Sequence, residues 1–140
     1  MQAIAQPLTL LALTLLVGCA APAQRPPEPA EPDPTELTGA WVFDGYDGAS
    51  RQMTFRRADT LADDNLGYRL RADGGLVRRS GGPCGTPPVH YGDWAGRWRA
   101  QPDGTLELSY DSWQREVVRE RWTLVRWEGD RLTVRVDRLR

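Results

Sequence analysis

The sequence predicts an all-β fold, a small antiparallel up-and-down β-barrel of about eight strands, which follows a signal peptide and a proline-rich linker. Two observations lead to this prediction. From Leu37 onward, apolar and polar residues alternate in short runs, as in strands with one buried face. Gly, Asp and Pro separate these runs at meander spacing, and such a meander hides its edges most simply by closing into a barrel.

Length and charge set the first limits on function. The chain has 140 residues, which predicts one folded domain. Its 18 basic and 19 acidic residues nearly balance, so the composition offers no basic surface for nucleic acid, and we predict no nucleic-acid partner. We divide the chain into a signal peptide (1–18), a lipidated cysteine with its tether (19–36) and a barrel domain (37–140).

The N-terminus has the pattern of an export signal. Residues 8–17 form an apolar run that is shorter than the roughly 20 residues of a membrane-spanning helix, and this matches the h-region of a secretory signal. The following segment, 16–19 (LVGC), resembles the lipobox of bacterial lipoproteins. The resemblance implies cleavage before Cys19 and attachment of acyl chains such as palmitate to that residue. The alternative is an ordinary secretory signal in which Cys19 has no role.

A proline-rich tether follows Cys19. Segment 20–36 contains six prolines, and repeated proline prevents both helix and central strand. We therefore expect an extended spacer that reaches about 50 Å. Ala20 follows the cysteine in place of Asp, and by the sorting rule of enteric-type lipoproteins this indicates the outer membrane. We expect the domain to be exported, to face the periplasm and to be held at the membrane by the lipid on Cys19.

Four strands are expected in the first half of the domain. Apolar residues alternate in 41–43, after Gly39, and again in 53–55. They alternate once more in 66–70, against two arginines on the other face. Segment 72–75 (ADGG) then predicts a hairpin turn, since glycine supplies the positive φ that primed turns require, and 76–79 is the returning strand.

Four more strands are expected in the second half. Segment 101–104 (QPDG) predicts a turn, because Pro fixes its own φ and Gly allows a positive φ. The Gly129-Asp130 pair predicts another turn. In each strand the apolar residues share one face; the strands are 94–100, 106–110, 118–124 and 132–136.

Residues 111–127 allow two interpretations. The segment lacks Gly and Pro, and Trp113, Val117 and Leu124 form a rough helical stripe. We favour strands because both neighbours are strongly β and the β-branched and aromatic content is high. The apolar phase slips by one residue after Leu124, which predicts a β-bulge or a sharp bend there.

Several short motifs carry a family resemblance. The opening of the domain resembles the Gly-x-Trp motif that opens the lipocalins, and the later motifs are similar to those of small bacterial lipocalin-like lipoproteins. The resemblance covers most of the domain and implies an up-and-down barrel that binds an apolar ligand. The motifs are 39–41 (GAW), 73–74 (DG), 84–88 (CGTPP), Tyr91 and 96–98 (GRW).

The aromatic residues are candidates for either a ligand pocket or the core. The chain has six Trp but two Phe, so the barrel needs indole rings merely to fill its interior. We expect a narrow cavity near Trp98 and Trp122 that opens, if anywhere, at the 84–88 loop. Trp113 and Trp127, beside charges and turns, are predicted at a rim or a partner surface. The candidates for pocket or core lining are Trp41, Tyr68, Trp94, Trp98 and Trp122.

A rigid loop is predicted at the barrel mouth, because its two prolines fix an extended segment. Its cysteine is either a small buried residue or the site of an intermolecular disulfide. That cysteine and His90 lie six residues apart, but a metal site needs three or four ligands, so we predict no metal and no other cofactor. The loop consists of Cys84, Gly85, Thr86, Pro87 and Pro88.

No catalytic constellation is recognisable. A Ser-His-Asp site would have to use His90, the only histidine, and no Gly-x-Ser-x-Gly turn is present. Glu120, in phase with Trp122, is expected to face the interior, either as an acid with a tuned pKa or, as we favour, beside a structural Arg. We therefore expect a binding protein that takes a small apolar molecule or an envelope protein. The alternatives are a structural or protein-interaction lipoprotein with a filled barrel and, more distantly, an enzyme.

Overall fold

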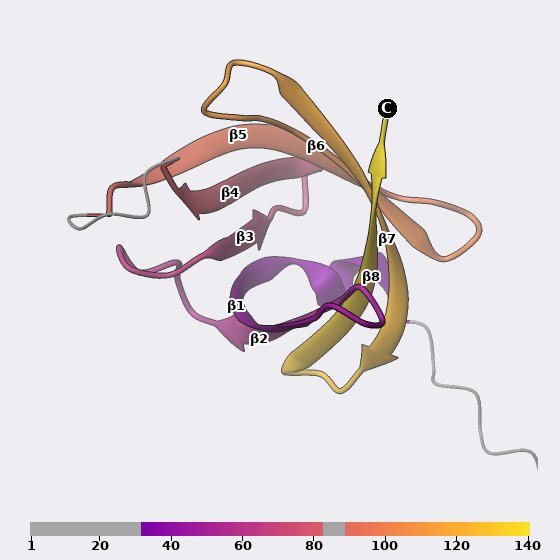
Figure 1. Cartoon of the computed structure of the whole chain (residues 1–140). Helices are drawn as coiled ribbons and strands as arrows, with labels where there is room; N and C mark the ends of the chain where they lie inside the picture. Colours follow the sequence, from indigo (N-terminus) through magenta and orange to yellow (C-terminus); the bar gives the residue numbers. More distant parts are fainter. Residues whose placement is uncertain (1–31, 83–88) are drawn as a thin grey trace, which may run out of the picture.

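Eight strands and one short 3-10 helix build the described part of the chain. The computed structural model describes residues 32–82 and 89–140. Its strands close into an antiparallel barrel, which confirms the predicted fold class (Figure 1). None of the described residues belongs to a helix long and apolar enough to cross a membrane. The elements are η1 (Pro34–Leu37), β1 (Gly39–Asp47), β2 (Gln52–Ala58), β3 (Gly67–Leu70), β4 (Gly75–Gly81), β5 (Tyr91–Ala100), β6 (Thr105–Asp111), β7 (Val117–Trp127) and β8 (Arg131–Leu139).

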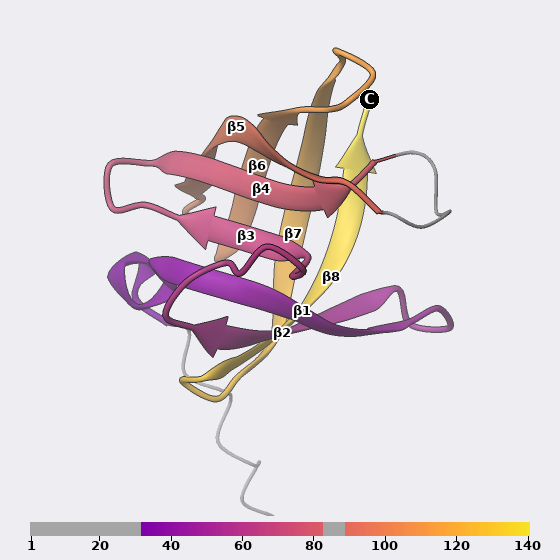
Figure 2. The ribbon, with the colours of Figure 1, turned by 90° about the vertical axis from the view of Figure 1, so that its left-hand side faces the viewer.

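The strand order differs from a strict meander at one point. From β3 to β8 each strand pairs with the next, but β3 pairs with β1 rather than with β2, and β2 closes the barrel against β8. The connection 59–66 therefore crosses β1 (Figure 2). A Cβ on Gly67 would lie 2.1 Å from the carbonyl oxygen of Trp41, so only glycine allows β3 to approach β1 this closely.

The segment that allowed two interpretations is a strand. Val117–Trp127 forms β7, so the helical alternative is wrong. Its pairing with β8 shifts register between Leu124 and Arg126, which confirms the predicted bulge. The expected turns before β4, β6 and β8 are present, with φ of 80°, 77° and 79° at Gly74, Gly104 and Gly129.

One end of the barrel, here called the capped end, is closed by η1 and the side chains around it. Leu37 of η1 is buried in the core, and the Trp41 indole N–H donates to its carbonyl oxygen over 2.7 Å. The guanidinium of Arg57 lies 4.4 Å from the Trp41 ring centroid and donates to the carbonyl oxygens of Glu36 and Thr38. Trp127, predicted at a rim, instead packs edge-on against Trp41, with ring centroids 5.6 Å apart, because the bulge turns it inward.

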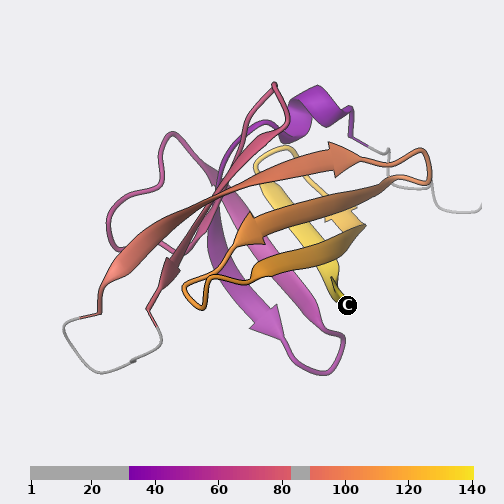
Figure 3. The ribbon, with the colours of Figure 1, turned by 90° about the horizontal axis from the view of Figure 1, so that it is seen from above.

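The other end, here called the distal end, is where β1, β4, β6 and β8 finish. Figure 3 shows η1 and the β1–β2 hairpin at opposite ends of the barrel. Between the two ends runs one apolar core, formed by alternate residues of all eight strands as the sequence pattern predicts. Its buried members include Trp41, Phe55, Leu70, Leu76, Trp98, Leu106, Leu108, Trp122, Leu132 and Val134.

Candidate functional site

The inward-facing residues change character along the barrel axis. Toward the capped end they are aliphatic or aromatic, as with Leu70, Leu76 and Leu106. Toward the distal end, inward-facing positions of the strands carry charged and hydroxylated side chains. We name these five the distal cluster: Tyr68 of β3, Arg78 of β4, Tyr110 of β6, and Glu120 and Trp122 of β7.

Glu120 is the centre of the distal cluster. Its Oε1 accepts a hydrogen bond from the Tyr110 hydroxyl over 2.6 Å. Its Oε2 accepts from the Trp122 indole N–H over 3.1 Å and from the Tyr68 hydroxyl over 3.4 Å. Three donors on three side chains therefore hold one carboxylate in a fixed orientation, which offsets much of the cost of placing it inside the barrel.

Arg78 provides the positive charge of the cluster. Its Nε–H donates to the Tyr68 hydroxyl over 3.2 Å, and its guanidinium lies 4.9 Å from the Tyr110 ring centroid. Because Tyr68 in turn donates to Glu120, the expected arginine partner of that carboxylate is present, but the link runs through a phenol. With respect to the described residues, this arrangement leaves the Nη edge of a half-buried guanidinium available to a further acceptor.

Burial keeps both phenols of the cluster protonated. It raises the pKa of Tyr68 to about 12, with a further contribution from the negative charge of Glu120 and an opposing one from Arg78. Burial also raises the pKa of Tyr110, reinforced by Tyr68 and Glu120. For Arg78, burial works against the charge, but Tyr68, Tyr110 and Glu120 outweigh it and raise its pKa. At neutral pH the cluster therefore contains two hydroxyl donors and a permanent cation.

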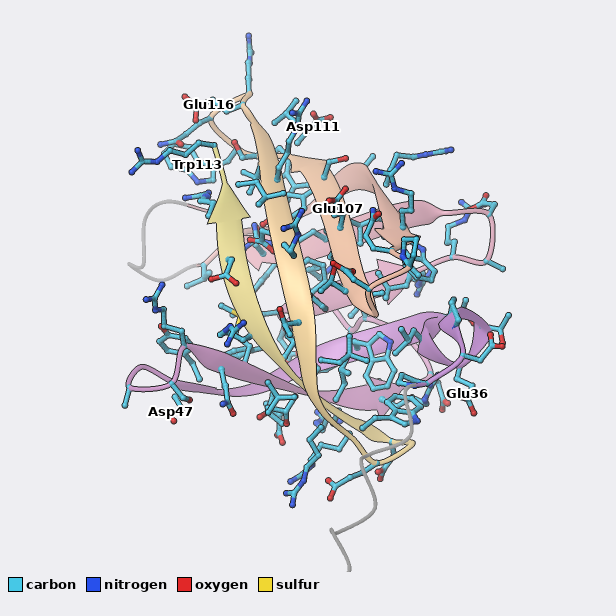
Figure 4. The ribbon with its side chains drawn as sticks, turned by 90° about the vertical axis from the view of Figure 1, so that its right-hand side faces the viewer. Glu36, Asp47, Glu107, Asp111, Trp113 and Glu116 are labelled. Atoms are coloured by element: carbon cyan, nitrogen blue, oxygen red, sulfur yellow. The ribbon has the colours of Figure 1, made fainter. Side chains whose placement is uncertain are left out.

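Trp94 lies beside this cluster on the way to solvent. It is the register partner of Arg78 on β5, it is half-buried, and its indole N–H donates to the Ser80 hydroxyl over 3.2 Å. Around it, apolar side chains are exposed at the distal end, and Figure 4 shows Trp113 there, near the finish of β8. We name these residues the distal rim: Tyr46, Val89, Tyr91, Trp113 and Val117.

The structure separates the aromatic candidates. Trp41 and Trp122 are completely buried, and Tyr68 is nearly so. Trp98 is also core, but its indole N–H donates to the Arg71 carbonyl oxygen over 2.8 Å, beside the turn between β3 and β4 at the capped end. Trp98 thus lies at the capped end, whereas β4 finishes and β5 begins at the distal end. The mouth of the expected cavity, the 84–88 loop, lies outside the described residues. Among the pocket-lining candidates, Trp94 is the tryptophan nearer the distal end.

Several sequence predictions fall outside the described residues or add nothing to the site. The lipid attachment site, Cys19, and the proposed mouth loop, 84–88, both lie outside the described residues. His90 is exposed. Within residues 32–82 and 89–140, no three His, Cys, Asp or Glu side chains gather as a set of metal ligands. The sequence analysis did not include Arg78 and Tyr110 among the candidate site residues. Arg78 alternates in phase with Leu76, and this pattern indicates that its side chain faces the barrel interior.

Together the fold and this site define a small closed antiparallel barrel with an apolar capped half and a polar distal half. Comparisons with family models, with curated proteins and with solved structures return no match. The functional argument therefore depends on the geometry of the distal end. This end of the barrel can orient a slender molecule that has one polar end. It provides an arginine, two phenols and a fixed carboxylate, and an aromatic ring and an apolar rim lie above them.

Proposed function

We propose that the protein is a lipid-anchored binding protein of the bacterial cell envelope, and that its barrel takes a small, largely apolar molecule at the distal end. One observation carries this proposal: the lining changes from apolar core to the distal cluster while Arg78 and Glu120 stay partly accessible. A barrel that served only as a scaffold does not need a cation and a carboxylate inside it, since replacing such a set as a whole with apolar residues of similar volume is often neutral or stabilising.

The surroundings of the cluster support an amphipathic ligand. Small-molecule sites are mostly apolar and contain a few placed polar groups that fix orientation. Trp94 and the distal rim supply the apolar contact, while the Nη edge of Arg78 supplies a donor to a polar end. Because the buried core extends from the capped end as far as Tyr110 and Val118, the ligand would enter only the part of the barrel nearest the distal opening.

The anchor fits the same proposal. Pro32, the first described residue, lies beside Leu37 and Gln101 at the capped end. The tether thus attaches opposite the distal cluster, so a barrel held by lipid on Cys19 keeps its binding end free of the attachment. This supports a protein that binds molecules from the space beside its membrane.

A second function is favoured by the distal rim. Its exposed side chains, with Trp113 46% and Val117 62% exposed, would also suit a protein partner. In that case the barrel interior would bind nothing and the protein would be an interaction lipoprotein. Ligand binding within the distal half separates the two functions.

The ligand-binding proposal is tested with a neutral apolar dye, N-phenyl-1-naphthylamine, titrated into the full chain and followed by fluorescence. We expect one dye per chain and an affinity about tenfold weaker in Trp94→Ala, since the loss of an aromatic contact is worth about 1.4 kcal/mol. The matched control is Trp98→Ala, on the same strand and also inward-facing but at the capped end. It should lower the free energy of unfolding by about 3–5 kcal/mol and leave the affinity unchanged.

Two results would overturn this proposal. If the wild-type chain binds no dye, the filled barrel with a protein partner is the better function. If Trp94→Ala binds as tightly as wild type, the dye lies elsewhere and the distal half is not the site. Should Trp98→Ala unfold, Trp98→Phe provides the same comparison with a smaller loss of packing.

Lipid anchoring has its own test. We expect wild-type protein expressed in a bacterium to partition into the detergent phase of Triton X-114 and to carry the mass of acyl chains. In Cys19→Ala the chain should remain unprocessed and carry no such mass, because only the Cys19 thiol can form the thioether. Wild-type protein that stays in the aqueous phase would leave the ordinary secretory signal as the better interpretation.

A further inference from the structure

The outer face of β5, β6 and β7 has two neighbouring cross-strand rows of side chains with different charge patterns. In the first row, Glu107 lies between Arg99 and Arg121 and accepts a hydrogen bond of 3.0 Å from each. These two bonds hold the pKa of Glu107 below its usual range, and the bond from Arg121 makes the larger contribution. We name this the paired row, and Figure 4 shows Glu107 on this face.

The second row has no carboxylate. Ser109 is the register partner of Arg97 on one side and of Arg119 on the other, and Leu139 ends the row on β8. Both arginines are exposed, and neither forms an ion pair with any residue of 32–82 or 89–140. We name Arg97, Ser109 and Arg119 the open row.

A hollow lies over the open row. Its volume is about 580 Å³, within the size range of small-molecule sites. All three open-row residues line it, together with Arg99 and Glu107 of the paired row. Glu107 is thus the one carboxylate among its described lining residues, and it is already bonded to two arginines. The hollow therefore presents uncompensated positive charge.

One acidic group outside the hollow, Asp73, interacts with the open row but does not neutralise this charge. Asp73 lies close enough to Arg97 for the guanidinium to contribute to its lowered pKa. However, the larger cause is its hydrogen bond from the Gly75 backbone N–H, and its ion pair is with Arg71 at 2.9 Å. Asp73 thus belongs to the turn between β3 and β4, and the open row keeps its net charge.

We propose that the open row binds a phosphate group. Arg97 and Arg119 project from strands separated only by β6, hence about 10 Å apart, and their long side chains can converge on an anion above Ser109. Two guanidinium groups and one hydroxyl provide donors for several oxygens, which suits a tetrahedral phosphate better than a planar carboxylate with two oxygens. The group could belong to a soluble phosphate ester or to a phospholipid headgroup, and both use the same donors.

This site is independent of the proposed function. It lies on the outer face of the barrel, whereas the distal cluster faces inward. Ligand binding at the distal end can therefore fail while the phosphate site stands, and the converse also holds.

The test is a titration of the full chain, followed by amide chemical shifts of β5, β6 and β7. The probes are inorganic phosphate, dihexanoyl phosphatidylglycerol below its micellar concentration and, as a headgroup of zero net charge, dihexanoyl phosphatidylcholine. We expect the amides of the open row to shift with inorganic phosphate, with phosphatidylglycerol or with both. The double variant R97Q/R119Q should bind at least tenfold more weakly, and wild-type affinity should fall as salt rises.

The matched control is Arg56→Gln, an exposed arginine on β2 without an ion pair in the described part of the chain, near the opposite side of the barrel. It should bind as wild type does. Binding of inorganic phosphate supports a soluble source, and binding of phosphatidylglycerol alone supports a headgroup. The proposal is overturned if neither inorganic phosphate nor phosphatidylglycerol shifts the open row, or if the control weakens binding as much as the double variant. Phosphatidylcholine carries the same phosphate, so equal binding of the two lipids would support recognition of the phosphate itself, and weaker binding of phosphatidylcholine would support a dependence on net charge as well.

Discussion

Trp122→Ala is expected to lower the free energy of unfolding by about 4 kcal/mol, because it removes a large side chain from the centre of the barrel. The indole is completely buried at the boundary between the apolar core and the distal cluster. It stacks on Phe55 with centroids 5.1 Å apart and meets the edge of Tyr68 at 4.8 Å. Its removal leaves a cavity bounded by strands, which cannot collapse to fill it.

A second loss adds to this cavity. The Trp122 indole N–H donates to Glu120, so alanine also removes one of the three donors that hold the carboxylate. The measurement is urea unfolding, with Trp113→Ala as the matched control. Trp113 is 46% exposed in the loop between β6 and β7, and its truncation should cost less than about 1 kcal/mol. Similar losses in the two variants would contradict the placement of Trp122 in the core.

The strands of this barrel could be predicted because their periodicity is local. Each run from β1 to β8 has one apolar face, and each hairpin turn that the sequence indicated has its glycine at positive φ. Even the slip after Leu124 was visible as a change of phase. These features need only neighbouring residues, so a single sequence contains them.

Strand pairing was less predictable, because it depends on contacts far apart in the chain. The pairing of β3 with β1 requires the close approach of Gly67 to the Trp41 backbone, and these residues are separated by the whole of β2. Nothing in the alternation of 66–70 distinguishes a β2 neighbour from a β1 neighbour. A meander was therefore the simplest expectation, and the crossing of β1 was not foreseeable.

The candidate site was predictable in part. Phase alone placed Glu120 inward, and the structure confirms this. The expected pairing with an arginine is indirect, because Arg78 donates to the Tyr68 hydroxyl and that hydroxyl donates to Glu120. What phase could not supply was the position of each residue along the barrel axis. Trp94 and Trp98 share a face of β5, yet one lies beside Arg78 at the distal end and the other beside Arg71 at the capped end.

The contrast between Glu120 and Glu107 shows how the same side chain acts in two environments. Each carboxylate accepts hydrogen bonds from more than one side chain. The partners of Glu107 are arginines on the outer face, where water can replace them. The partners of Glu120 include Tyr110 and Trp122, whose side chains are buried inside the barrel. The two should therefore differ in their importance to stability.

Glu120→Leu is accordingly expected to lower the free energy of unfolding by about 3 kcal/mol. Leucine preserves most of the volume but accepts no hydrogen bond, so the Tyr110 hydroxyl and the Trp122 indole lose their acceptor within the barrel, at about 1–3 kcal/mol for a buried group. Arg78 also loses the nearest negative charge, which makes its own burial more costly. Glu120→Gln retains one acceptor oxygen and should cost only about 1 kcal/mol.

Glu107→Leu is the matched control for this prediction, because it removes the same charge from a carboxylate with two ionic partners. Ion pairs on the outer face are weakened by water and salt, so its free energy of unfolding should remain close to that of wild type. Urea unfolding of the four proteins at neutral pH measures the series. If Glu120→Leu proves no less stable than Glu107→Leu, the hydrogen bonds to Glu120 contribute nothing beyond what solvent provides. The distal cluster would then owe its charged residues to ligand binding alone, because stability would no longer account for them.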